Sequence, residues 1–146
     1  MALCSRSSKV VIELTFCLMG FYNRLKVFGR KHLDPLECAR KIVDVASDKQ
    51  AANIVLLDIR KLGVFADAFV IMTADSRRQM TALVEDLLEA VAHVGARARH
   101  REGTVESGWV LLDFGDVVVH LFAPDERSYY QLEELWSQGQ QIVRVQ

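Results

Sequence analysis

The sequence has few of the residues that stabilise small proteins through covalent or metal cross-links. Its 146 residues include only three cysteines, Cys4, Cys17 and Cys38. Proline, which restricts the backbone, is also scarce, with two residues. An odd number of cysteines without paired spacing argues against a disulfide framework and against a structural metal site. Free thiols are also typical of a reducing compartment. We therefore expect a fold stabilised by packing, with no metal and no cofactor.

The chain also lacks a long apolar run. The apolar stretch at 10–19 is interrupted by Glu13 and Thr15, and it is too short to span a bilayer. Residues 21–23 form a poor cleavage site for a secretory signal. We interpret residues 1–33 as a leader outside the domain, either a dispensable extension or a misassigned start, in a cytoplasmic protein. The alternative is a transit peptide for a mitochondrion or plastid, which the basic, acid-poor composition permits.

Charge divides the chain at the same point. Residues 1–33 carry six basic side chains and one acidic side chain, whereas residues 34–146 carry twelve basic and eighteen acidic ones. The net charge is therefore +5 in the leader and −6 in the remainder. An acidic domain disfavours direct binding to a phosphate backbone and suits a basic protein partner.

Capping signals and periodicity predict the elements of the domain. Asp34 as N-cap with Pro35 after it predicts a first helix that continues to about Lys49. The later elements are strands at 53–59 and 68–73, a helix from a Ser76 cap to a Gly95 stop, an edge strand at 96–101, a hairpin at 109–122 and a last helix at 124–136. This order predicts an α/β domain at 34–137 with a mixed five-stranded sheet and helices packed on it. Residues 138–146 are expected to form a tail outside the domain.

The stretch 109–122 is the most informative part of the sequence. Two β-prone apolar runs flank residues 113–116, Asp-Phe-Gly-Asp, which predicts a β-hairpin with a tight turn. Because both runs are almost wholly apolar, we expect most of both strands to be buried. Trp109, Asp113 and Asp116 then lie at the margins of an apolar element, where charged groups need partners or water. The hairpin is therefore a candidate recognition surface.

A metal-dependent enzyme is the alternative interpretation. Asp58, Asp113 and Asp116 form a conceivable carboxylate set for two-metal phosphoryl or nucleotidyl transfer. The pattern disfavours this set, because Asp113 and Asp116 flank a turn instead of alternating along one strand. The turn at 73–76 has no glycine, so a triphosphate approaches its backbone less easily. His120 has no second His or Cys nearby and is expected to be a hydrogen-bonded sheet residue. We predict a protein without catalytic residues.

Several segments of the domain share the pattern of one known family. They are residues 34–37 (Asp-Pro-Leu-Glu), 54–60 (Ile-Val-Leu-Leu-Asp-Ile-Arg), 66–73 followed by 76–79, 108–122 and 129–136. In this order and without a large gap, they resemble the ribosomal silencing factor (Iojap) family over about residues 34–137. The block from Trp109 to Phe122 and the ending Tyr-Gln-Leu-Glu-Glu-Leu-Trp make the resemblance specific. Ala74 and Asp75 depart from it, since family members more often have a glycine and a small polar residue there.

The resemblance implies a translation factor and not an enzyme. Proteins of this family bind a large-subunit ribosomal protein, the fourteenth in large-subunit numbering, on the face that meets the small subunit. They thereby prevent the subunits from joining, which lowers translation when nutrients are scarce. The resemblance also implies a core like that of a nucleotidyltransferase without its catalytic residues, and a homodimer.

One partner-binding surface is predicted to contain Trp109, Asp113, Asp116 and Tyr130. Trp109 and the two carboxylates come from a single hairpin, whereas Tyr130 is added through the resemblance. A half-exposed tryptophan is a residue type that dominates interface energies, and carboxylates suit a basic partner. The alternative for Trp109 is a place in the core.

Because charge and helix signals both change near residue 34, the leader should be dispensable for folding. We expect a chain that begins at Lys31 to unfold cooperatively with the thermal midpoint of the whole chain, as measured by circular dichroism. Loss of cooperative unfolding in the shortened chain would show that the leader belongs to the core.

Overall fold

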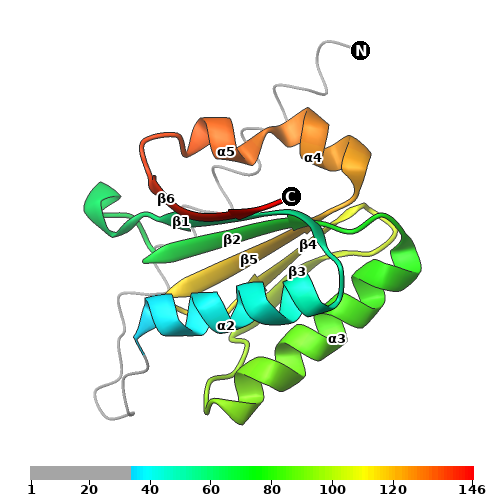
Figure 1. Cartoon of the computed structure of the whole chain (residues 1–146), viewed down its shortest axis with the longest axis horizontal. Helices are drawn as coiled ribbons and strands as arrows, with labels where there is room; N and C mark the ends of the chain where they lie inside the picture. Colours follow the sequence, from blue (N-terminus) through cyan, green and yellow to red (C-terminus); the bar gives the residue numbers. More distant parts are fainter. Residues whose placement is uncertain (1–33) are drawn as a thin grey trace. The chain divides into compact units, whose positions relative to one another are not determined.

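The computed structural model describes residues 34–146, so the expectations for residues 1–33 lie outside the described part of the chain. The helices are α2 (Pro35–Asp48), the short 3-10 helix η1 (Arg60–Leu62), α3 (Arg77–His93), α4 (Pro124–Tyr130) and α5 (Leu132–Leu135). The strands are β1 (Ala52–Asp58), β2 (Ala68–Thr73), β3 (His100–Thr104), β4 (Trp109–Asp113), β5 (Val117–Phe122) and β6 (Gln140–Val145). The predicted α/β class is confirmed (Figure 1). Across the described residues, no helix combines the length and apolarity needed to cross a bilayer.

The strands form one mixed sheet in the order β3-β4-β5-β2-β1-β6. The central pair β2 and β5 is parallel, and the other neighbouring pairs are antiparallel. The predicted strand count of five is wrong by one, because residues 140–145 form a sixth strand that pairs with β1. The segment 138–146, expected as a tail, therefore contributes to the sheet. The residues of β6 are half-buried or exposed. An edge strand of this kind does not need the uninterrupted apolar run by which the inner strands were predicted.

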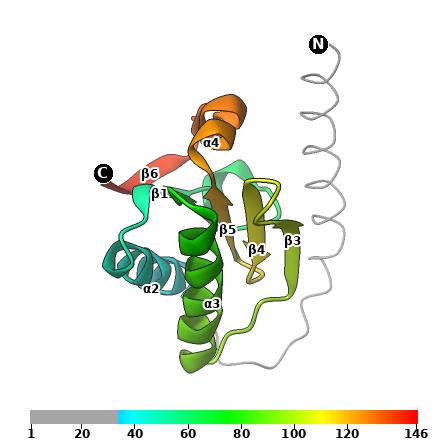
Figure 2. The same cartoon turned by 90° about the vertical axis from the view of Figure 1, so that its right-hand side faces the viewer.

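Helices α2 and α3 lie on the same face of the sheet (Figure 2). Asp34 caps α2, with Oδ1 accepting the Leu36 N–H at 3.3 Å. Ser76 caps α3, with Oγ accepting the Gln79 N–H at 3.1 Å. The prediction of both helix starts is confirmed, as is the end of α3 before Gly95, whose φ is 84°. The buried apolar side chains of both helices form one core with the inward residues of β1, β2, β4 and β5.

The segment α4–α5 packs on the opposite face of the sheet. Trp136 lies against Phe69 of β2, with 5.1 Å between the ring centroids. The single last helix that was predicted is wrong, because Gln131 adopts a left-handed conformation with φ of 44° and separates α4 from α5. Because of this break, α4 and α5 do not share one continuous apolar face. Leu132 is consequently buried, whereas Leu135 is 53% exposed.

The predicted hairpin is confirmed. Strands β4 and β5 pair from Trp109 opposite Phe122 as far as Asp113, and Gly115 in the turn has φ of 95°. Every residue of β5 is buried, and β4 is buried from its second residue onward. The edge strand was predicted at 96–101, whereas the observed strand β3 is His100–Thr104, so the predicted bounds are wrong by a few residues. The reason is tertiary, since among the described strands β3 pairs with β4 alone, and the five residues of β4 determine which positions can pair.

Because β6 supplies the outer pairing of β1, a chain that ends at Ser137 should be less stable. Loss of β6 removes the apolar side chains of Ile142, Val143 and Val145, which pack against the core, and leaves β1 as an unpaired edge strand. We expect the free energy of unfolding, measured by urea titration, to fall by about 2–4 kcal/mol. A chain that lacks only Gln146 is the control and should match wild type. An unchanged urea midpoint without β6 would place this strand outside the cooperative fold.

Candidate functional site

Four aromatic side chains gather where β4, β5 and α4 meet. Trp109 and Phe122 lie opposite each other in the ladder, and their ring centroids are 5.1 Å apart. Tyr130, at the end of α4, lies 4.8 Å from Trp109, and Tyr129 packs edge-on against Tyr130 at 4.9 Å. The cluster extends from the fully buried Phe122 to Tyr129, which is 53% exposed. We term these four residues the aromatic face.

A buried histidine orients the indole of Trp109 from the sheet side. Trp109 Nε1 donates a hydrogen bond to Nδ1 of His120 at 3.3 Å. The His120 ring is fully buried and stacks on Phe122 with 6.1 Å between centroids. Burial, assisted by the Arg127 charge, lowers the pKa of His120 to about 3, so the ring is neutral and Nδ1 remains an acceptor at neutral pH. The prediction of a hydrogen-bonded sheet histidine is confirmed.

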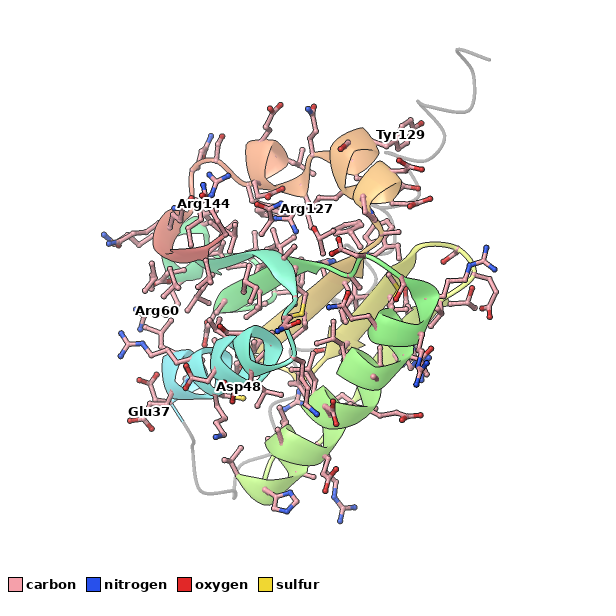
Figure 3. The ribbon with its side chains drawn as sticks, turned by 45° about the vertical axis from the view of Figure 1, so that its right-hand side comes forward. Glu37, Asp48, Arg60, Arg127, Tyr129 and Arg144 are labelled. Carbon is pink, nitrogen blue, oxygen red and sulfur yellow. The ribbon has the colours of Figure 1, made fainter. Side chains whose placement is uncertain are left out.

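Arg127 attaches α4 and α5 to the sheet. Its guanidinium donates to the Asn53 carbonyl oxygen at 2.9 Å and to Thr73 Oγ1 at 3.2 Å. It also pairs with Glu133 of α5, with Nε 3.0 Å from Oε1. Asn53 has φ of 47° where the β1–β2 register shifts, which leaves its carbonyl outside the β1–β2 ladder. Figure 3 shows Arg127 between α4 and the strands, whereas Tyr129 projects away from the sheet.

Carboxylates lie beside the aromatic face. Asp125 and Glu126 occupy the first turn of α4. The Glu126 carboxylate lies 2.5 Å from the place that a Cβ at Gly108 would take, so a side chain at this position would collide with it. Burial raises the pKa of Tyr130, and Tyr129 and Glu126 raise it further. The phenol therefore stays protonated, and the negative charge here comes from the carboxylates.

The two turn carboxylates lie at the opposite end of the hairpin from Trp109. Four residue steps along β4 separate Trp109 from Asp113, about 13 Å in an extended strand. Asp113 is 9% exposed, and its Oδ1 accepts the Gly115 N–H at 2.7 Å. Asp116 is half-buried, and its backbone carbonyl accepts N–H groups at the start of β2. The structure thus brings Trp109 and Tyr130 together and places the two carboxylates apart from them.

Asp58, the third carboxylate of the alternative metal set, is paired with Arg60. Arg60 Nε lies 3.0 Å from Asp58 Oδ1, and this hydrogen bond is the main cause of the lowered pKa of Asp58. Within residues 34–146, no group of three His, Cys, Asp or Glu side chains has the geometry to hold a metal ion. The described residues therefore give no support to a two-metal centre.

Sequence reasoning found two residues of the aromatic face but missed the contacts that position them. Arg127 and Glu133 are six residues apart with a helix break between them, so no helical spacing pairs them. Trp109 and His120 are diagonal neighbours across the hairpin, a contact that the strand register implies once the turn is known. The Trp109–His120 contact could therefore have been predicted from the strand register, whereas the Arg127–Glu133 contact required the tertiary fold.

The charge of Asp113 can be separated from its hydrogen bond. Burial raises the pKa of Asp113, so the folded state holds a proton more readily than the unfolded state. Stability is then lost as the pH rises through the folded pKa, because charged Asp113 is partly desolvated. Asp113→Asn keeps the acceptor for the Gly115 N–H and removes the charge. We expect its free energy of unfolding at neutral pH to equal or exceed that of wild type, and the difference to vanish in acid.

Asp113→Ala is the matched control for the hydrogen bond. It removes the acceptor as well as the charge, and we expect it to be less stable than Asp113→Asn by about 1–2 kcal/mol at neutral and acid pH. Urea titrations of the three proteins at both pH values measure this. A clear loss of stability in Asp113→Asn at neutral pH would mean that the turn requires the charge itself.

The described residues of this chain are similar to known proteins. The family described as "Ribosomal silencing factor during starvation" matches residues 32–146. Ribosomal silencing factor RsfS of Halalkalibacterium halodurans is 38% identical over 100 residues, which cover 68% of this chain and 86% of that protein. The Mus musculus protein named "Mitochondrial assembly of ribosomal large subunit protein 1" is 30% identical over 99 residues, which cover 66% of this chain and 43% of that protein.

A solved structure has the same fold. The crystal structure of protein CV0518 from Chromobacterium violaceum superposes with a TM-score of 0.69 at 32% identity, and covers 78% of this chain and 94% of that one. The resemblance found in the sequence is thereby confirmed. A match that extends from the first described helix to the last strand, with a shared fold at this identity, means that the chain belongs to the ribosomal silencing factor (Iojap) family.

Proposed function

We propose that this protein represses translation by binding the large ribosomal subunit and preventing the subunits from joining. Family membership supports a ribosomal role, and the name of the mouse relative refers to assembly of the large subunit. The proposed partner is the fourteenth protein of the large subunit, on the face that meets the small subunit. The observation that carries the proposal is the aromatic face, which has the aromatic composition of a protein-binding surface.

The aromatic face is suited to anchor a partner. Trp109 is half-buried and is held by ring contacts to Phe122 and Tyr130 and by its hydrogen bond to His120. Tyr129 extends the same surface outward and is 53% exposed. Side chains that are already ordered lose little conformational entropy on binding, and Trp and Tyr dominate interface energies. Trp109 and Tyr130 are therefore the proposed anchors.

The charge of the domain supports a basic partner. Residues 34–146 have a net charge of −6, and Asp125 and Glu126 lie next to the anchors. Complementary charge increases the rate at which partners meet and determines their orientation. An interface of standard size covers about 800 Å² on each partner, enough to extend from Trp109 to the hairpin turn. Asp113 and Asp116 therefore stay predicted contacts at the rim of this surface, with Asp113 also serving the turn.

The proposal excludes catalysis and includes self-association. Asp58 and Asp113, two of the three carboxylates in the alternative metal set, each have a structural partner, Arg60 and Gly115, which argues against this set as a metal centre. We propose a homodimer located in the cytoplasm, or in a mitochondrion or plastid if residues 1–33 are a transit peptide. The likeness to a nucleotidyltransferase core stays a prediction.

Trp109→Ala should weaken binding to isolated large subunits by about thirtyfold, on the order of 2 kcal/mol, because it removes the proposed central anchor. Wild type should slow the joining of large and small subunits, followed by light scattering, and the variant should not. Since Trp109 also packs on Phe122, thermal melting is measured on the same samples. Trp109→Phe keeps a ring in this place and should retain the fold while losing part of the affinity.

Val64→Ala is the control for removal of an exposed apolar side chain. Val64 is 36% exposed and lies in the loop before β2. Strand β2 begins opposite Val117, whereas Trp109 is paired with Phe122 at the other end of β5. This variant should bind and slow joining like wild type. If saturating wild-type protein leaves subunit joining unaffected, the proposed function is wrong. If joining is slowed equally by wild type and by folded Trp109→Ala, the aromatic face is not the anchor.

A further inference from the structure

We propose that residues 97–101, at the outer edge of the sheet, bind the phosphate backbone of duplex RNA. We term Arg97, Arg99, His100 and Arg101 the basic edge. The proposal adds a second contact surface to the domain and does not rest on the aromatic face. In the setting of a ribosome, it would let the domain contact protein and RNA at the same time.

Residues 97–101 hold three of the twelve basic residues of this domain within five positions. Residues 34–146 carry a net charge of −6, yet residues 97–101 contain three arginines, one histidine and no acidic residue. Without these arginines the remainder of the domain would have a net charge of −9. The total charge, which disfavours contact with phosphate, therefore conceals a local basic surface.

Arg97 and Arg101 have no carboxylate partner among the described residues. His100 lies 3.3 Å from the Glu102 carboxylate. The other ion pairs among the described residues involve Lys49, Arg60 and Arg127, and none of them includes Arg97 or Arg101. The side chains of Arg97 and Arg101 are both exposed. Their charge is consequently available to an anionic ligand.

Arg99 has a different role and attaches the segment to the hairpin. Its backbone N–H donates to the Asp113 carbonyl oxygen at 2.7 Å. Its guanidinium carbon lies 2.7 Å from the place that a Cβ at Gly115 would take, so the side chain lies over the turn. The positive charge of Arg99 also lowers the pKa of Asp113 against the larger effect of burial. Arg97 and Arg101 therefore lie on either side of Arg99, the residue that is attached to the hairpin turn.

The position of the segment favours an extended ligand. Strand β3 is the outermost strand, visible in Figure 2 at the side of the sheet away from β6. Arg101 is paired with Leu112 of the core face, and His100 is paired with Asp113 of the opposite face, so the guanidinium of Arg101 and the imidazole of His100 lie on different faces of the edge. Outer N–H groups of an edge strand are further donors for phosphate oxygens.

A nucleic acid suits these features better than a small anion does. Guanidinium groups match phosphate oxygens in pairs, and separate cations along an edge suit repeated phosphates. A duplex RNA backbone has this repeat, and RNA duplexes are recognised mainly through backbone and shape. An acidic protein surface would present carboxylates without that regular spacing.

The test measures binding of the full-length protein to a fluorescent duplex RNA hairpin by anisotropy, between about 50 and 200 mM salt. The double variant R97Q/R101Q removes the two exposed guanidinium groups and leaves Arg99 in place. The matched control is R77Q/R78Q, which removes two exposed arginines at the start of α3. All proteins have the same leader, so its charge contributes equally to each.

Wild type should bind, and R97Q/R101Q should bind several-fold more weakly, with a salt slope smaller by about 1.8, since each phosphate contact contributes about 0.9. R77Q/R78Q should behave like wild type, and all three should have equal melting midpoints. The proposal is overturned if wild type does not bind at the lowest salt, or if both double variants lose affinity equally. It is also overturned if polyglutamate competes as well as unlabelled RNA at equal charge concentration. None of these outcomes depends on subunit joining, so the proposed function is tested separately.

Discussion

The position of the last helices, and with it the aromatic face, depends on the guanidinium of Arg127. This side chain is 11% exposed and links α4 to α5 through Glu133, to β1 through the Asn53 carbonyl and to β2 through Thr73. A cation this far from water needs several partners at once, because an unpaired buried charge is strongly destabilising. These contacts determine where α4 lies on the sheet. As a consequence, Tyr130 at the end of α4 lies against Trp109.

The same charge has a second effect on the sheet below it. Together with burial, it keeps His120 neutral, and a neutral ring with Nδ1 free to accept is what the indole N–H of Trp109 requires. Orientation of the surface tryptophan is thus set by a residue that no partner can reach. The arrangement combines a rigid inner layer of ring contacts with an outer layer, Tyr129, that is open to solvent.

Distribution of charge, more than its total, distinguishes the surfaces of this domain. Acidic side chains lie in the first turn of α4 beside the aromatic face, and the arginines of residues 97–101 lie along the β3 edge near the hairpin turn. The hairpin β4–β5 connects the two regions, since Trp109 stands at one end and the Asp113 turn at the other. The domain thus has one region that suits a basic protein and another that suits an anionic backbone, and the two meet at the hairpin turn. This is consistent with a family described as a ribosomal silencing factor.

Local signals in the chain were sufficient for the helix caps at Asp34 and Ser76, for the inner strands and for the hairpin, because each depends on neighbouring residues or on an uninterrupted apolar run. The chain alone also identified the family. Strand β6 was not predictable in the same way, since a half-exposed edge strand acquires its structure from pairing with β1. The break at Gln131 and the contacts of Arg127 likewise required the fold, because they join segments up to 74 residues apart through a conformation that no local spacing encodes.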